Sequence, residues 1–164
     1  MKEAKPNNVK ILDTRKTTPG LRIFEKYAVT AGGGYNHRLD LSSGILIKDN
    51  HIKAAVGVAK AIEKIKRMNY KLPIEIEAEN LKQIKEGLKA GVEGFLLDNM
   101  KPEKIINCVK FIRSQPGGRD IFIEASGGIT LKTLKGYVIT GVNAISVGAL
   151  THSAKATNIH IEFI

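Results

Sequence analysis

Residues 81–98, LKQIKEGLKAGVEGFLLD, contain the pattern that best predicts the fold of this chain. Apolar side chains at helical spacing lead up to Gly91, and a short apolar run then stops at Asp98. A glycine directly after a helix ends it, and an apolar run without strict alternation predicts a strand covered on both faces. Residues 131–148, LKTLKGYVITGVNAISVG, follow the same design with Gly141 in the equivalent turn. Both stretches therefore predict a helix followed by a buried strand.

The same alternation of strand and helix extends over the rest of the chain. Strands are predicted at residues 9–12, 44–47, 74–77, 94–97, 121–124 and 144–147. Helices are predicted at residues 21–31, 52–69, 81–90, 102–114 and 131–140, and residues 160–164 alternate like an additional strand. Asn80, Pro102 and Thr130 are suitable residues to begin the last three helices. Strands separated by helices form a parallel sheet through right-handed crossovers.

Polar residues follow nearly every predicted strand, and this distribution separates two parallel architectures. A doubly wound sheet gathers its functional groups at one switch point, whereas a barrel draws them from several strands. The six predicted strands are fewer than the eight of a complete TIM barrel. We therefore predict an α/β fold, an incomplete TIM-like barrel of six parallel strands, as a single domain over residues 1–164.

The composition is that of an ordinary globular protein. Of 164 residues, 43% are hydrophobic and 26% are charged. No apolar stretch approaches the roughly 20 residues that span a bilayer. Residues 1–6, MKEAKP, lack the apolar core of a secretory signal, so we expect a cytoplasmic protein with no membrane partner. The single cysteine, Cys108, excludes an internal disulfide and is interpreted as buried filler.

The formal net charge of +10 admits three interpretations. A nucleic-acid protein, an enzyme for polyanionic small molecules and a lysine-rich surface all show such a balance. Most lysines lie in the predicted helices, which favours a solvated surface. Aromatic residues make up 5% of the chain and tryptophan is absent, so there is no stacking platform for single-stranded nucleic acid. Arg15, Arg22 and Arg38, by contrast, crowd the first 38 residues around the candidate site.

The polar groups at the strand ends are predicted to meet on one face, because parallel strands share an edge. The chain supplies five cationic side chains to this face: Arg15, Lys16, His37, Arg38 and Lys48. Arginine forks match carboxylates and phosphates, and lysine supplies a point charge. Glu77 and Asp98 end neighbouring strands, and their carboxylates are suitable ligands for Mg²⁺. They could also form hydrogen bonds to a sugar or stabilise a developing positive charge. The alternative is that they only form structural ion pairs with lysines. Together these groups predict a ligand rich in carboxylate and phosphate.

Two late strands end in glycine turns that resemble phosphate-binding loops. Ser126, Gly127 and Gly128 follow one strand, and Ser146 and Gly148 end the next. Backbone N–H groups in such turns, with a helix N-terminus behind them, bind anions. Barrels often hold a phosphate after their last two strands. One such turn alone would indicate only a tight connection, but two on adjacent strands favour a phosphate site.

Six motifs occur in an order that resembles one enzyme family. They are residues 14–22 (TRKTTPGLR), 32–38 (GGGYNHR), 46–52 (LIKDNHI), 96–100 (LLDNM), 124–129 (EASGGI) and 146–153 (SVGALTHS). Over nearly the whole chain they resemble quinolinate phosphoribosyltransferase, also called nicotinate-nucleotide pyrophosphorylase (carboxylating). The resemblance implies an enzyme of NAD biosynthesis that uses quinolinate, 5-phosphoribosyl-1-pyrophosphate and Mg²⁺. Its products would be nicotinate mononucleotide, pyrophosphate and CO₂.

The resemblance also implies a role for each residue of the site. The residues implied to hold the carboxylates of quinolinate are Arg15, His37, Arg38 and Lys48. Lys16 is implied to reach the pyrophosphate, and Glu77 and Asp98 to face the ribose and Mg²⁺. With Lys48, these two carboxylates form the implied catalytic set. The residues implied to contact phosphates or the substrate beside them are Ser126, Gly127, Gly128, Ser146 and Gly148.

Members of this family carry an N-terminal domain ahead of the barrel, and we expect this chain to lack it. That domain helps to form the dimer and lends an arginine to the neighbouring site. We therefore expect a homo-oligomer or association with the absent domain, and slow turnover by the chain alone. The alternatives are a related phosphoribosyltransferase that uses nicotinate, an inactive fragment and a basic binding module. We expect no nucleic-acid partner.

Overall fold

A single parallel sheet forms the centre of the computed structural model, which describes Met1, Ala4 and residues 7–163. Its strands are β1 (Lys10–Leu12), β2 (Ile45–Ile47), β3 (Ile74–Ala78), β4 (Gly94–Asp98), β5 (Phe122–Ser126) and β6 (Ala144–Ser146). They lie in the order β1-β6-β5-β4-β3-β2, which follows the chain from β2 to β6 and returns to β1. Among the described residues no pairing joins β1 to β2, so the barrel is open there. The predicted incomplete barrel of six parallel strands is confirmed.

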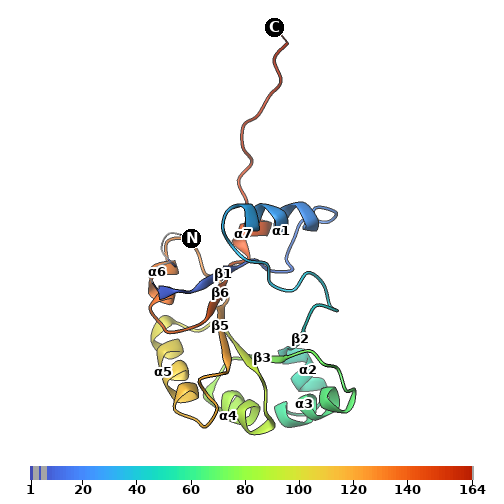
Figure 1. Ribbon diagram of the computed structural model, residues 1–164, viewed down its shortest axis with the longest axis vertical. Coiled ribbons are helices and arrows are strands. Elements are labelled where there is room, and N and C mark those ends of the chain that lie inside the picture. Colours follow the sequence, from blue (N-terminus) through green and yellow to red (C-terminus); the bar gives the residue numbers. More distant parts are fainter. Residues whose placement is uncertain (2–3, 5–6, 164) are drawn as a thin grey trace.

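Most of the helices lie on the outer side of the curved sheet (Figure 1). Those formed by the described residues are α1 (Arg22–Ala31), α2 (Asp49–Ala54), α3 (Val58–Arg67), α4 (Leu81–Ala90), α5 (Pro102–Arg113), α6 (Leu134–Val138) and α7 (Ala149–His152). α1 contacts α7 at one end of the molecule. The apolar core fills the space between sheet and helices, where Ile76, Phe95 and Ile123 are fully buried. α4 approaches so closely that a Cβ on Gly87 would lie 2.8 Å from the ring of Phe95.

The inner face of the barrel is polar, because strand side chains alternate between the two faces. Ile76 points outward to α4, where a Cβ on Gly87 would lie 3.5 Å from it. Its neighbours Glu75 and Glu77 therefore point inward. The pairing of β3 with β4 and of β4 with β5 puts Glu124 on the same inner face. Carboxylates from two strands are thus brought into the interior of the barrel.

Several local signals are confirmed at the ends of the helices. The side chain of Asn80 accepts a hydrogen bond from the Gln83 N–H at 3.0 Å and caps α4. Gly91 ends the same helix with φ +72°, in the left-handed region that suits glycine. Pro102 lies in the first turn of α5. Cys108 is buried on α5, and its sulfur lies 4.0 Å from that of Met100, as expected of apolar filler.

Other local predictions were wrong. The single helix expected at residues 52–69 is two helices, α2 and α3, because Val56 (φ +57°) and Gly57 (φ +132°) leave helical geometry between them. The helix expected at residues 131–140 forms only from Leu134 to Val138, after a turn in which the N–H groups of Thr133 and Leu134 donate to the carbonyl oxygen of Thr130. In both cases a turn interrupts or shortens the helix that periodicity alone would extend.

The C-terminal segment departs from its prediction as well. Residues 160–163 form no strand, and residue 164 lies outside the described residues. The segment runs away from α7 into solvent (Figure 1), with Ile159, Ile161 and Phe163 exposed. An alternating pattern alone does not make a strand, because a strand needs a partner for its backbone groups. Among the described helices, none combines the length and apolar composition that crossing a bilayer requires.

Candidate active site

A cavity of about 660 Å³ lies at the carboxyl ends of the strands. All twelve residues predicted for the site line it, which confirms that they meet on one face. They are Arg15, Lys16, His37, Arg38, Lys48, Glu77, Asp98, Ser126, Gly127, Gly128, Ser146 and Gly148. The roles of the individual residues remain predictions. The cavity is also lined by residues that were not among the predicted site residues, including Thr14, Asn99, Thr130, His152 and Ser153.

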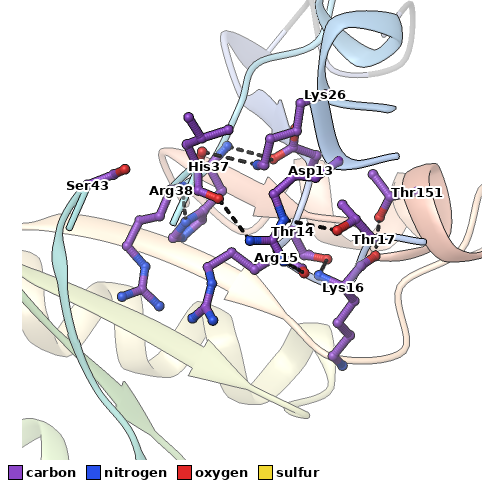
Figure 2. Close-up of polar contacts among 12 residues, drawn as sticks. Asp13, Thr14, Arg15, Lys16, Thr17, Lys26, His37, Arg38, Ser43 and Thr151 are labelled. Atoms are coloured by element: carbon purple, nitrogen blue, oxygen red, sulfur yellow. Dashed lines mark hydrogen bonds and ion pairs between the residues drawn. The ribbon is translucent and has the colours of Figure 1, made fainter. Parts of the chain in front are cut away.

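Two segments carry cationic side chains: the loop after β1, with Arg15 and Lys16, and the segment after α1, with His37 and Arg38. A buried network places these two segments beside each other (Figure 2). Asp13 directly follows β1 and is 0% exposed, and it forms an ion pair with Lys26 of α1, with Nζ 2.5 Å from Oδ1. The same Oδ1 accepts a hydrogen bond from the backbone N–H of His37 at 2.8 Å. Tyr35 also forms a parallel bridge with Leu12 of β1. These contacts fix the segment with His37 next to the loop that follows β1.

His37 uses both ring nitrogens within the protein. Nδ1 accepts a hydrogen bond from the backbone N–H of Arg38 at 2.7 Å, and Nε2 lies 3.1 Å from Oε2 of Glu124. Burial lowers the pKa of His37, but the hydrogen bond and charge of Glu124 outweigh it, so the pKa is raised above 6.5. The ring is therefore held in one orientation by the protein. Its contact with Glu124 was not predicted from the sequence.

Arg15 and Arg38 bring two positive charges together at the cavity wall. Burial first, and repulsion from Arg15 second, lower the pKa of Arg38. Nη1 of Arg38 donates to the carbonyl oxygen of Gly44 at 3.0 Å. The Nε atoms of both arginines are buried and have no hydrogen-bond partner within the described chain. Unpartnered cationic donors of this kind favour an anionic ligand such as a carboxylate or phosphate.

Glu77 and Asp98 lie on the neighbouring strands β3 and β4 at the mouth of the barrel. Oε2 of Glu77 is 2.7 Å from Nζ of Lys48. Burial, and then the charge of Glu77, raise the pKa of Asp98. Two carboxylates that repel each other gain from a cation placed between them, and Mg²⁺ takes few protein carboxylates together with substrate oxygens. The donor set therefore fits Mg²⁺.

A second pair of carboxylates, Glu75 and Glu124, lies deeper in the barrel. Glu124 is fully buried, and ligand atoms of His37, Glu75 and Glu124 all lie within 4.8 Å of one another. Burial first, and the charge of Glu124 second, raise the pKa of Glu75 to about 8. Arg38 supplies compensating charge to both. The signal that was overlooked is the alternation in residues 74–78, IEIEA, which puts Glu75 on the same face as Glu77.

The glycine turns differ in part from their prediction. Gly127 (φ +95°) and Gly128 (φ +61°) both have positive φ, and a Cβ on Gly127 would collide with Asn99. No helix begins directly behind them, since α6 starts only at Leu134, and the helix after Gly148 has 4 residues. The helix N-terminus predicted behind the turns is therefore absent behind Gly128, whereas α7 does begin at Ala149, directly after Gly148. Backbone N–H groups held by the turn geometry are what these loops offer an anion.

Fold and site together define a class: a parallel α/β-barrel domain with a cavity at the carboxyl ends of its strands that is lined by cationic side chains, carboxylates and glycine turns. Its carboxylate pair fits a divalent cation, and its glycine turns fit a phosphate. Barrel enzymes build their active sites on this edge.

Residues 1–162 match the family described as quinolinate phosphoribosyl transferase, C-terminal domain. A Bacillus subtilis protein named probable nicotinate-nucleotide pyrophosphorylase [carboxylating] is 46% identical over 94% of this chain and 52% of its own length. The human nicotinate-nucleotide pyrophosphorylase [carboxylating] is 37% identical over 93% of this chain and 51% of its own. The crystal structure of NadC from Streptococcus pyogenes has a TM-score of 0.86 at 41% identity, covering 96% of this chain and 54% of that one.

The chain belongs to the quinolinate phosphoribosyltransferase family. The enzymes of this family are nicotinate-nucleotide pyrophosphorylases (carboxylating), pentosyltransferases of NAD biosynthesis. The chain spans about half the length of the curated relatives it matches, 52% in one case and 51% in another.

Proposed function

We propose that this chain is the catalytic domain of a quinolinate phosphoribosyltransferase. The reaction joins quinolinate to the phosphoribosyl group of 5-phosphoribosyl-1-pyrophosphate and yields nicotinate mononucleotide, pyrophosphate and CO₂. The observation that carries the proposal is that arginines, paired carboxylates and glycine turns all line the same cavity of about 660 Å³. A dicarboxylate and a polyphosphate ester are ligands whose charges these groups complement.

In this proposal the cationic wall binds quinolinate. Arg15 and Arg38 present guanidinium groups to its carboxylates, and Lys48 adds a third positive charge. His37 lies at the same wall, but its two ring nitrogens already bind Glu124 and the backbone of Arg38. We therefore assign His37 the task of orienting Arg38. This role differs from the direct contact with substrate that the family resemblance implies.

The remaining residues are proposed to hold the phosphoribosyl donor. Lys16 reaches the pyrophosphate, Ser146 and the glycine turns surround the phosphates, and Glu77 and Asp98 face the ribose. When bound, Mg²⁺ neutralises the charge that develops on the leaving pyrophosphate. The two carboxylates also stabilise the positive charge that the ribose carbon acquires as the pyridine nitrogen attacks it. Positioning and electrostatic stabilisation supply most of the rate acceleration in such a reaction.

The ion pair of Lys48 and Glu77 is proposed to exchange partners when substrates bind. The two groups now neutralise each other at 2.7 Å. A carboxylate of quinolinate would give Lys48 a new partner, and Glu77 would be one of the residues that hold Mg²⁺. Each charge therefore stays compensated as the ligands enter, which keeps the cost of separating the pair small.

The test is an assay of nicotinate mononucleotide formation from quinolinate, 5-phosphoribosyl-1-pyrophosphate and Mg²⁺. We expect slow turnover by the chain alone, and faster turnover when the remaining half of a relative is added. Asp98→Asn should lower the rate on the order of 100-fold, whereas Glu79→Gln, an exposed carboxylate outside the cavity, should leave it unchanged. No product under either condition, or tighter calorimetric binding of nicotinate than of quinolinate, would refute the proposal.

A further inference from the structure

Helix α1 is attached to both segments that carry the cationic side chains. Arg22 donates from Nε to Oγ1 of Thr17 at 3.0 Å, and from Nη2 to the carbonyl oxygen of Arg15 at 3.1 Å. The third guanidinium nitrogen of Arg22, Nη1, donates to the carbonyl oxygen of Leu39 at 3.4 Å. One guanidinium group thus joins the loop that follows β1 to the segment at residues 36–39.

The two segments need such a connection because they bring like charges together. The charge of Arg15 contributes, after burial, to the lowered pKa of Arg38. Both side chains extend in the same direction from their segments (Figure 2), and the Nε atom of each is buried without a partner in the described chain. Their repulsion acts to separate the segments, and the contacts of α1 oppose it.

We propose that Arg22 is a positioning residue that fixes the separation of Arg15 and Arg38, and so makes the cavity selective for ligands with carboxylates on adjacent ring atoms. The inference rests on the proposed function for its ligand class, an aromatic 1,2-dicarboxylate. Bidentate pairs of arginine with carboxylate depend on geometry as well as charge. A change in the spacing of the two guanidinium groups therefore lowers the affinity for a ligand whose carboxylates match this spacing. The affinity for a ligand that does not match it falls less.

The chemistry of the guanidinium group explains why an arginine stands at this position. Its donors form a planar fork that can reach three acceptors at once, whereas a lysine offers a single point charge. Lys26, one turn later on α1, ties the same two segments through Asp13 and the carbonyl oxygen of His37 at 3.3 Å. Lys26 is 2% exposed, so its substitution would disturb folding. Arg22 is only partly buried and can be changed with less risk to the fold.

The test uses two ligands of equal charge and composition, benzene-1,2-dicarboxylate and benzene-1,3-dicarboxylate, which have no ring nitrogen to react. Calorimetric titration should show that the unmodified chain prefers the 1,2-isomer. Arg22→Gln should reduce this preference about tenfold, the effect of losing one to two charge-assisted hydrogen bonds. Arg22→Lys keeps the charge but not the fork, and should lose most of the preference as well. Arg67→Gln, on the surface of α3, is the matched control and should keep it.

Each outcome decides the question. Equal weakening of both isomers by Arg22→Gln, or an unchanged ratio in both variants, overturns the inference. So does an unmodified chain that binds neither isomer or does not discriminate between them. If the preference depends on Arg22 but no nicotinate mononucleotide forms in the transfer assay, the inference stands and the proposed function fails. If the product forms and the ratio does not depend on Arg22, the reverse holds.

Discussion

Glu75 lies inside the barrel, where its carboxyl group is close to the buried carboxylate of Glu124. Burial and that neighbouring charge raise its pKa to about 8, from an ordinary value of 4.5. The charges of His37 and Arg38, from the segment after Tyr35, act to lower this pKa, and the charge of Glu77 on the same strand acts to raise it. At neutral pH the folded chain therefore keeps a proton at Glu75 that the unfolded chain would release.

This proton makes the stability of the fold depend on pH. A raised pKa stabilises the folded state fully below about pH 4.5, and this contribution is lost as the pH rises to about 8. His37, whose pKa is also raised, acts in the same direction above pH 6.5. The glutamine side chain introduced by Glu75→Gln cannot ionise. The free energy of unfolding of this variant, measured in urea relative to the unmodified chain, should rise between pH 5 and pH 8 by at most about 1.4 kcal/mol per pH unit.

The control for this measurement is Glu79→Gln, because Glu79 is exposed and lies outside the cavity. Its stability should follow that of the unmodified chain at every pH. Parallel curves for Glu75→Gln and the unmodified chain would show that Glu75 is ionised at neutral pH in the folded state.

At the scale of the elements, the turn after β5 depends on its neighbour, the turn after β4. Asn99 follows β4 with φ +52°, and its backbone N–H donates to the carbonyl oxygen of Ser126 at 3.0 Å. A Cβ on Gly127 would lie 2.7 Å from that same Asn99 nitrogen, whereas a Cβ on Gly128 would have no atom within 4 Å. The two glycines are therefore required for different reasons, close approach at one and backbone conformation at the other.

Alanine substitutions at the two glycines should separate these effects. Gly128→Ala should cost about 1 kcal/mol of unfolding free energy, the usual cost of left-handed backbone for a residue with a Cβ. Gly127→Ala adds a collision with Asn99 and should cost roughly 3 kcal/mol. Denaturant unfolding of both variants measures the difference. Equal losses would mean that the turn after β4 can move away from Gly127.

Across the molecule as a whole, α1 carries several large apolar side chains that are exposed on its outer face. Ile23, Phe24 and Tyr27 are 75%, 71% and 72% exposed, and Leu21 precedes them at 47%. The opposite side of the helix carries Lys26 and Val29, which are buried. Contiguous exposed apolar patches mark interaction surfaces. We predict that, when the chain is studied by itself, a second copy covers this face, which is how the homo-oligomer expected from the sequence would form.

The inferred association predicts a concentration-dependent mass in sedimentation velocity. The double substitution Phe24→Glu and Tyr27→Glu puts charge into the apolar face and should shift the chain to the monomer. Leu131→Glu changes a residue that is 79% exposed and remote from α1 in sequence, and should leave the association unchanged. A monomer at all concentrations of the unmodified chain, or an equal shift in the control, would show that α1 does not mediate association.

The architecture and the edge of the sheet that carries the site could both be predicted from local features of the sequence. Strand and helix periods, the glycines after helices and the residues that end each strand are local signals. Gly91 and Asn80 set the ends of α4 through contacts within a few residues. Parallel strands place their carboxyl ends on one edge whatever their exact pairing. The convergence of Arg15, Glu77 and Gly148 therefore followed from the order of elements alone.

The contacts between groups at that edge could not be predicted from the sequence, because they depend on how distant segments pack. The pairing of His37 with Glu124, the ion pair of Lys26 with Asp13 and the contacts of Arg22 join residues whose spacing in sequence carries no periodic signal. They depend on how α1 and the segment after it pack beside β1, where Tyr35 bridges Leu12, and on where β5 places Glu124 inside the barrel. The unpaired segment at residues 160–163 shows the same limit, because an alternating pattern becomes a strand only when the fold offers it a neighbour.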